Sequence, residues 1–300
     1  MELSYWSVLL LLLKLVVYVA SAALAGTLVL RLLNRNNKAS ANNVATFNNY
    51  IKRGALVCLS LALIASILQV PIEAGAMAES GFSGMTDAFM LEIAWKSVIG
   101  EQALVRMPAF LLAIVAVSTW GKYSPLFNTL NILVTVVVLI VITYSFTFTG
   151  HSAEKNLWIK ALLVLHVLAI TCWVGSLLPL YKSCQLLALT EVKRLMHQFG
   201  QLAIMIIVLL LASGITLILQ YLDTVADLFT SSYGQLILLK LLLVSAMLML
   251  GAWHKLSLVP QITEEHHVLT LKRSISIEMF IALTVLIITS IFTTLVGPPI

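Results

Sequence analysis

Charged residues are scarce in this chain. Only 10% of its 300 residues are Asp, Glu, Lys or Arg, while 60% are hydrophobic, and the mean hydropathy is +1.02. A soluble domain carries charge on about a quarter of its residues. A chain this apolar has too little polar surface to cover a soluble core, so its composition predicts an integral membrane protein.

Cysteine is also rare, and the chain lacks several signatures of soluble enzymes. Its three cysteines, Cys58, Cys172 and Cys184, show no Cys-x-x-Cys spacing, which argues against a disulfide framework. The sequence has no Gly-rich phosphate loop and no soluble segment to hold one, so we expect neither an ATPase nor another enzyme. It contains no base-reading element, and we expect no nucleic-acid partner.

Long apolar stretches dominate what is present. Each spans about 18 to 25 residues, enough for a helix that crosses a hydrocarbon layer of about 30 Å. Because backbone groups cannot go unpaired in lipid, these stretches must be helices. The sequence predicts an all-α, polytopic membrane bundle that forms a single domain over residues 1–300. Its eight transmembrane helices are predicted at 6–30, 54–78, 103–120, 126–148, 158–180, 199–221, 236–253 and 275–296.

The distribution of basic residues predicts the topology. Most of the 18 Lys and Arg residues fall in the loops after the first, third, fifth and seventh stretches, whereas the alternate loops carry mainly acids. Basic loops face the cytoplasm, so both termini are predicted to be periplasmic. The basic excess then reflects topology and contact with anionic lipid. Because Arg31 and Arg35 follow the first stretch and no basic segment precedes it, we expect a retained helix rather than a signal peptide.

Two histidines stand out in this hydrocarbon-rich chain. His151 follows the fourth stretch in Gly150-His151-Ser152, and His166 lies about eight residues inside the fifth. Imidazole is costly in a bilayer and is a good ligand for soft and borderline metals, so the pair indicates a metal path or two separate metal sites. The alternative is structural: His151 anchors a helix end at the interface, and His166 packs within the bundle.

Methionines supply candidate soft ligands. Met85 and Met90 lie in the acidic segment after the second stretch, at the predicted outer face. Thioether sulfur suits Cu(I), which tolerates low coordination. The alternative is ordinary packing, because methionine commonly fills gaps between helices.

A polar cluster is predicted near the outer ends of the second, third and seventh stretches. Glu73, Arg106 and Lys240 lie at similar depths in their predicted helices. Buried charges need partners, so Glu73 is expected to form an ion pair with Arg106 or Lys240. The functional alternative is a polar mouth of a cavity.

Several motifs carry a family resemblance. They are Gly150-His151, Leu165-His166 followed by Trp173-Val174-Gly175, Tyr233-Gly234-Gln235-Leu236, and Arg273 to Glu278 followed by Pro298-Pro299. In order and spacing they resemble the copper resistance protein D family over residues 100–299, while the first hundred residues match only in their pattern of spans.

The resemblance implies copper homeostasis and resistance, with copper moving from the periplasm to the cytoplasm across the bacterial inner membrane. Copper, as Cu(I) rather than Cu(II), would be collected by His151 with Met85 or Met90 and passed to His166. Glu73, Arg106, Lys240 and Trp173 would shape the entrance. A separate small periplasmic copper-binding protein is the implied partner. The chain departs from common members at His254, where an uncharged polar residue is more usual, and in having few outer methionines.

Two other functions remain open on the sequence. Histidines in a helical bundle also ligate b-type haem in electron-transfer proteins, which requires two of them at equal depth on facing helices. His166 has no evident partner of that kind. The other possibility is a copper-binding scaffold or sensor that transports nothing.

Overall fold

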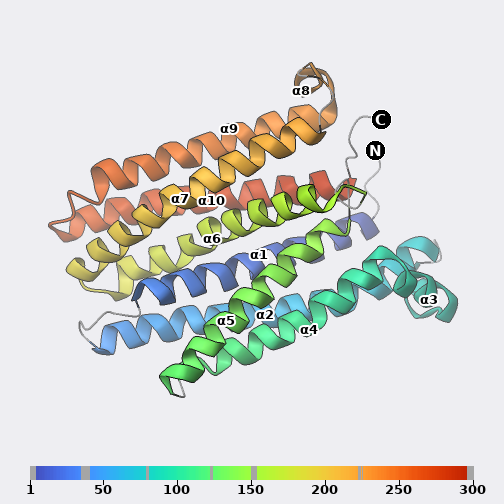
Figure 1. Cartoon of the computed structure of the whole chain (residues 1–300), viewed down its shortest axis with the longest axis horizontal. Helices are drawn as coiled ribbons and strands as arrows, with labels where there is room; N and C mark the ends of the chain where they lie inside the picture. Colours follow the sequence, from blue (N-terminus) through green and yellow to red (C-terminus); the bar gives the residue numbers. More distant parts are fainter. Residues whose placement is uncertain are drawn as a thin grey trace. The chain divides into compact units, whose positions relative to one another are not determined.

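The computed structural model describes residues 5–34, 41–78, 81–121, 124–149, 154–221, 224 and 226–295, and all regular structure within these ranges is helical (Figure 1). Eight of the described helices are long and apolar enough to cross a membrane, which confirms the prediction of an all-α bundle with eight membrane helices. The helices are α1 (Tyr5–Asn34), α2 (Ala41–Ala78), η1 (Gly81–Thr86), α3 (Ala88–Lys96), α4 (Val98–Ser118), α5 (Pro125–Tyr144), η2 (Ser145–Thr147), α6 (Leu157–Leu186), α7 (Leu189–Tyr221), α8 (Asp227–Thr230), α9 (Ser232–Trp253), η4 (His254–Leu258) and α10 (Glu265–Leu295).

Three helices begin well before the apolar stretches that predicted them. α2 begins at Ala41 rather than 54, α7 at Leu189 rather than 199, and α10 at Glu265 rather than 275. The added turns contain Asn, Lys, Glu and His. The number of consecutive apolar residues indicates which part of a helix lies in the hydrocarbon core of the bilayer. It does not indicate where the helix begins, because residues such as Lys and Glu retain good helix propensity outside that core.

The chain divides into two compact units, each assembled from segments that are distant in sequence. Unit 1 comprises residues 1–21, 56–168 and 289–300, and unit 2 comprises residues 22–55 and 169–288. Helices α1, α2, α6 and α10 contribute to both units.

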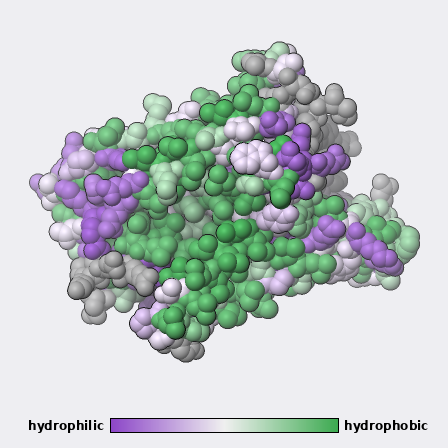
Figure 2. All heavy atoms as spheres, in the orientation of Figure 1, coloured by the Kyte–Doolittle hydropathy of each residue, from purple (hydrophilic) through white to green (hydrophobic). Residues whose placement is uncertain are grey.

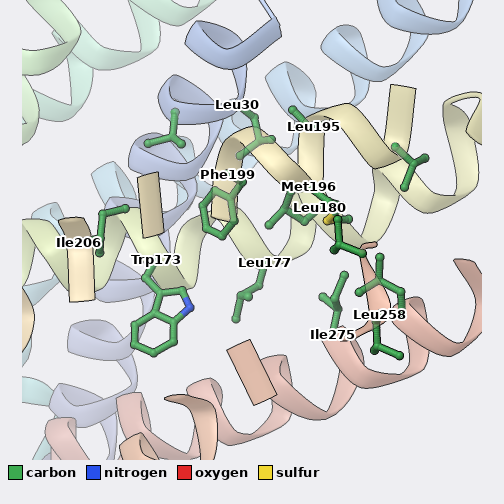
Figure 3. Packing of buried hydrophobic residues seen from close by; sticks show 14 of the residues in the cluster. Leu30, Trp173, Leu177, Leu180, Leu195, Met196, Phe199, Ile206, Leu258 and Ile275 are labelled. Carbon is green, nitrogen blue, oxygen red and sulfur yellow. The ribbon is translucent and has the colours of Figure 1, made fainter. Parts of the chain in front are cut away.

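The core of unit 2 is a dense set of aliphatic and aromatic side chains. Figure 3 shows Trp173 and Leu177 of α6 with Phe199 of α7 and Ile275 of α10 in this core. Each of these side chains is less than 9% exposed. Lipid tails are as apolar as these side chains, so tight packing rather than expulsion from water holds such helices together.

Small residues bring α1 and α6 into backbone contact within unit 2. A methyl group added at Gly175 would overlap the carbonyl oxygen of Ala22, and one added at Gly26 would overlap the backbone of Gly175. Ala22 and Gly26 are four residues apart, the spacing that places small side chains on one helix face. The contact therefore requires glycine at both Gly26 and Gly175.

Unit 1 holds a smaller core beside α3. Met90 packs there against buried Val70, Ala74, Ala94 and Ala103. The short helix α3 is therefore held against α2 and α4 by small and aliphatic side chains.

Asp87 caps the start of α3, where its Oδ1 accepts a hydrogen bond of 2.9 Å from the backbone N–H of Met90. We expect Asp87→Ala to destabilise α3 by about 1 kcal/mol, because the amide loses its acceptor. Faster hydrogen exchange of the α3 amides would show this loss. Glu92→Ala is the control, since Glu92 forms only an exposed pair with Lys96 and should change exchange little. Equal effects of the two substitutions would contradict the capping role.

The side chains on the outside of the helices are largely apolar. Leu126, Leu157, Leu256 and Phe280 are each more than 70% exposed, and Figure 2 shows apolar side chains across much of the visible face. A soluble monomer rarely exposes so much apolar surface, whereas a lipid-facing one must.

Candidate functional site

A buried carboxylate lies at the centre of a polar cluster in unit 2. We call this the Glu278 cluster: Trp173, His254, Ser274 and Glu278. Glu278 is only 2% exposed, and its Oε1 accepts a hydrogen bond of 2.9 Å from the indole Nε1 of Trp173. Its Oε2 lies 3.4 Å from Nδ1 of His254, whose Nε2 lies 2.7 Å from Oγ of Ser274. Three helical segments therefore converge on one carboxylate.

The local structure explains how these side chains meet. Ser274 and Glu278 are four residues apart on α10 and so share one face of the helix. His254 begins η4, a π-helical turn closed by a hydrogen bond of 2.9 Å from the N–H of Val259 to the carbonyl oxygen of His254. Such turns are rare and occur frequently at functional sites, because they redirect the side chains around them.

The geometry at His254 suits a bound cation. When Nε2 carries the proton and donates it to Ser274, the lone pair of Nδ1 faces the carboxylate of Glu278. Two ligands at 2.0–2.2 Å from one metal, at a tetrahedral angle, are about 3.4 Å apart. The separation of Nδ1 and Oε2 is 3.4 Å. The pair can therefore bind one cation between its two atoms.

This site offers two ligands rather than a complete set. Within the described ranges, no group of three or more His, Cys, Asp and Glu side chains is positioned to hold a metal. A cation held by His254 and Glu278 keeps open positions for water or for an incoming ligand. Open coordination favours transient binding over permanent structural binding.

A second polar cluster lies in unit 1, around a buried arginine. We call this the Arg106 cluster: Gln69, Gln102, Arg106, Ser145 and Phe146. Arg106 is 1% exposed, and its Nε donates to Oγ of Ser145 at 2.8 Å. Its Nη1 donates to Oε1 of Gln69 at 3.3 Å, and the guanidinium carbon lies 4.9 Å from the centre of the Phe146 ring. Gln69 Nε2 in turn donates to Oε1 of Gln102 at 3.4 Å.

The predicted ion pair between Glu73 and Arg106 was wrong. In the part of the chain that the structure describes, no carboxylate oxygen lies within 4.0 Å of the Arg106 guanidinium. Gln69, one turn before Glu73 on α2, supplies the acceptor instead. Lys240 lies half-buried in unit 2, and its pairing with Glu73 stays a prediction.

The four predicted metal ligands lie in different surroundings, and one of them lies outside the described residues. His151 lies outside the described residues, while His166 lies half-buried on α6 in unit 1. Met85 is half-buried, and its Cγ lies close to Gly75 of α2. Met90 packs against the core beside α3, so its observed role is packing. Ligand roles for all four residues stay predictions.

Sequence reasoning did not bring Glu278 and His254 together. A signal for each was present, because an ionisable side chain inside an apolar stretch marks a functional position. Their meeting depends on the position of η4 beside α10, which one sequence does not reveal. Trp173 was assigned to an entrance cluster, but its partner in the structure is Glu278.

Two parts of the chain match known protein families. Residues 4–161 match the family described as Copper resistance protein D-like, N-terminal domain, and residues 193–292 match Copper resistance protein D. The likeness thus reaches further toward the N-terminus than the motifs at 100–299. The second match contains His254, Ser274 and Glu278.

One known relative is named for copper transport. The chain is 26% identical over 302 aligned residues to the Copper transport protein CutJ of Bacillus subtilis (strain 168). The alignment covers 95% of this chain and 52% of that protein, so the chain spans about half the length of this relative. No solved structure matches the chain. With eight membrane-spanning helices and family matches over most of its length, the chain belongs to the copper resistance protein D family of copper-related, multi-pass membrane proteins.

Proposed function

We propose that this protein moves copper ions across the bacterial inner membrane, from the periplasm to the cytoplasm. The observation that carries the proposal is Glu278, a carboxylate 2% exposed within the membrane-spanning helix α10. Among the described residues, no Lys or Arg lies within 4.0 Å of it, and the ionisable side chain that does is His254, whose Nδ1 lies 3.4 Å from Oε2. A buried carboxylate in a membrane is costly unless a cation or hydrogen bonds compensate it. A copper ion passing through the bundle supplies that charge.

The proposed path joins the predicted outer ligands to the Glu278 cluster. By the predicted topology, copper is collected at the outer face by His151 with Met85 or Met90 and then passes to His166. The His254–Glu278 pair follows nearer the cytoplasmic side. Cu(I) suits this path because it accepts few ligands and binds imidazole and thioether well.

The driving force requires no nucleotide. An inside-negative potential favours entry of a monovalent cation by about 2.3 kcal/mol per 100 mV. A separate small periplasmic copper-binding protein delivers the ion in this proposal. Copper is the cargo, so each ligand pair must bind it reversibly.

Electron transfer through b-type haem is less well supported. Nε2 of His254 is taken by Ser274, and the Glu278 carboxylate lies 3.4 Å from Nδ1, which leaves room for a bare ion between them but not for an iron that carries a porphyrin ring. A haem ligated by two histidines needs one free nitrogen from each.

Copper uptake into proteoliposomes tests the proposal. The full chain is reconstituted with a copper-sensitive dye inside the vesicles, and Cu(I) is added outside under reducing conditions. We expect uptake above that of protein-free vesicles, faster with an inside-negative potential. Glu278→Gln should lower the rate at least about 10-fold, because it removes the charge and a ligand oxygen. Glu264→Gln, which changes an exposed glutamate, should retain the wild-type rate.

Three other outcomes would contradict transport or the role of Glu278 in it. Copper binding without uptake above protein-free vesicles would identify a scaffold or sensor. A haem absorption band in the purified protein would identify an electron carrier. Equal uptake by wild type and Glu278→Gln would remove Glu278 from the path.

A further inference from the structure

Two lysines and two tyrosines meet in unit 2, close to the end of α6 and the beginning of α10. Nζ of Lys182 on α6 lies 5.7 Å from the centre of the Tyr181 ring, and Nζ of Lys272 on α10 lies 5.2 Å from it. Nζ of Lys182 also lies 5.1 Å from the centre of the Tyr50 ring on α2. We call these four residues the tyrosine–lysine patch. Three helices of unit 2 therefore bring two cations to one aromatic surface.

No acid balances the positive charge of this patch. In the described segments of unit 2, no carboxylate oxygen lies within 4.0 Å of the ammonium group of Lys182 or Lys272. An ammonium group has three N–H donors. Lys182 uses one of them in a hydrogen bond of 3.0 Å to Oε1 of Gln185, whereas Lys272 contacts the Tyr181 ring. Most of these donors therefore remain for a further acceptor, and two neighbouring cations favour an anionic one.

Two other lysines near the same helix ends have structural partners. Nζ of Lys193 donates to the backbone oxygens of Pro260 and Ile262, at 3.0 and 3.1 Å. Nζ of Lys255 donates to the backbone oxygen of Gly200 at 3.0 Å. These bonds connect α7 to η4 and to the segment after it. The lysines of the tyrosine–lysine patch differ, because they are half-buried but make no such contact with a backbone oxygen.

The patch continues into the apolar surface that faces lipid. Leu178 lies four residues before Lys182 on α6, and Leu283 lies eleven residues, or about three turns, after Lys272 on α10. Each leucine therefore shares a helix face with its lysine, and they are 47% and 44% exposed. Both pairs lie within helices that can span a membrane. Tyrosine rings gather at the level of the lipid head groups, which places the lysines where lipid phosphates lie.

We propose that the tyrosine–lysine patch binds an anionic phospholipid. The ammonium groups of Lys182 and Lys272 contact its phosphate, and its acyl chains lie along the exposed leucines of α6 and α10. Basic sites between membrane helices suit anionic head groups. A phosphatidylcholine head group fits less well, because its own quaternary ammonium would lie beside two lysines. The basic loops predict contact with anionic lipid in general, whereas this site holds one lipid at defined residues, and its occupancy does not require copper.

Native mass spectrometry of the full chain tests the proposal. The protein in detergent is titrated with phosphatidylglycerol or with phosphatidylcholine of the same acyl chains. Each lysine near an anionic surface contributes a factor of about five in affinity. The wild type should therefore bind phosphatidylglycerol at least about 5-fold more tightly than phosphatidylcholine. The double variant Lys182→Gln with Lys272→Gln should bind phosphatidylglycerol about 20-fold more weakly than the wild type, with its affinity for phosphatidylcholine unchanged.

Two controls separate the site from charge elsewhere on the protein. The double variant Lys182→Arg with Lys272→Arg keeps both charges and should retain the wild-type preference for phosphatidylglycerol. Lys96→Gln, which removes a lysine whose side chain is 75% exposed in unit 1, should also retain it. Equal affinity of the wild type and the double glutamine variant for phosphatidylglycerol would overturn the proposal.

The comparison of the two lipids on the wild type alone is also decisive. Equal affinity for phosphatidylglycerol and phosphatidylcholine would overturn the proposal even if the double glutamine variant failed to fold. None of these measurements involves copper. The lipid site can therefore fail while copper uptake is observed, and it can be confirmed while copper uptake is absent.

Discussion

Gly175→Val is expected to leave little folded protein. The added side chain would overlap the carbonyl oxygen of Ala22, so α1 and α6 would have to separate along their contact in unit 2. Overpacking a core typically costs about 1–3 kcal/mol, and here the obstacle is backbone, which cannot rotate away. Fluorescence-detected size exclusion should show a large loss of the monodisperse peak, with a lower Tm for any remainder.

Gly251 offers a matched control in the same unit. It lies on α9, and no heavy atom lies within 4 Å of a methyl group added there. Gly251→Val carries the same β-branched penalty within a helix but meets no obstacle. Gly251→Val should give a yield of folded protein close to that of the wild type. Similar losses of folded protein in the two variants would show that the loss in Gly175→Val does not arise from the α1–α6 contact.

His254→Leu is expected to cost about 3 kcal/mol of stability, because it leaves the carboxylate of Glu278 facing an apolar side chain. The double variant His254→Leu with Glu278→Leu should recover most of that loss, since an apolar pair of similar volume needs no partner. Neither variant should bind copper at His254. Unfolding by denaturant in detergent, together with copper binding at equilibrium, measures both effects.

The chain contains an exposed counterpart of this pair. His266 Nδ1 lies 3.2 Å from Oε2 of Glu264, with both side chains more than half exposed. Exposed ion pairs contribute little, so His266→Leu should change stability by less than about 0.5 kcal/mol. If His254→Leu has no larger effect than His266→Leu, the Glu278 cluster is not an important buried interaction.

Hydropathy predicts the spans in this chain because the bilayer imposes one length on every crossing helix. It does not predict where the helices begin. α10 begins at Glu265, in a segment that contains adjacent acids and histidines, because a helix continues wherever its own hydrogen bonds and propensity allow. The same applies to the Asn-containing start of α2.

In the candidate sites, the sequence likewise indicates some features and not others. Arg106, Trp173 and Glu278 were recognisable as unusual residues in apolar surroundings. Their partners were not, because the expected acid for Arg106 is replaced by the amide of Gln69, and Glu278 meets a histidine from another helix. The π-helical turn at His254 has no signature that hydrophobic periodicity would reveal. Partner choice is decided by tertiary packing, which lies beyond local sequence.

The division of the chain into units has a consequence for biosynthesis. Unit 1 includes the final turns of α10, where Ser290 Oγ donates to the backbone oxygen of Leu11 and Thr293 accepts from Lys14. α1 emerges from the ribosome long before these partners are made. Lys14 must therefore wait in the membrane, without its acceptor, until seven more helices have been inserted. If α1 left the translocon early, the Lys14 side chain would be exposed to lipid. We therefore expect α1 to stay at the translocon until α10 has been inserted.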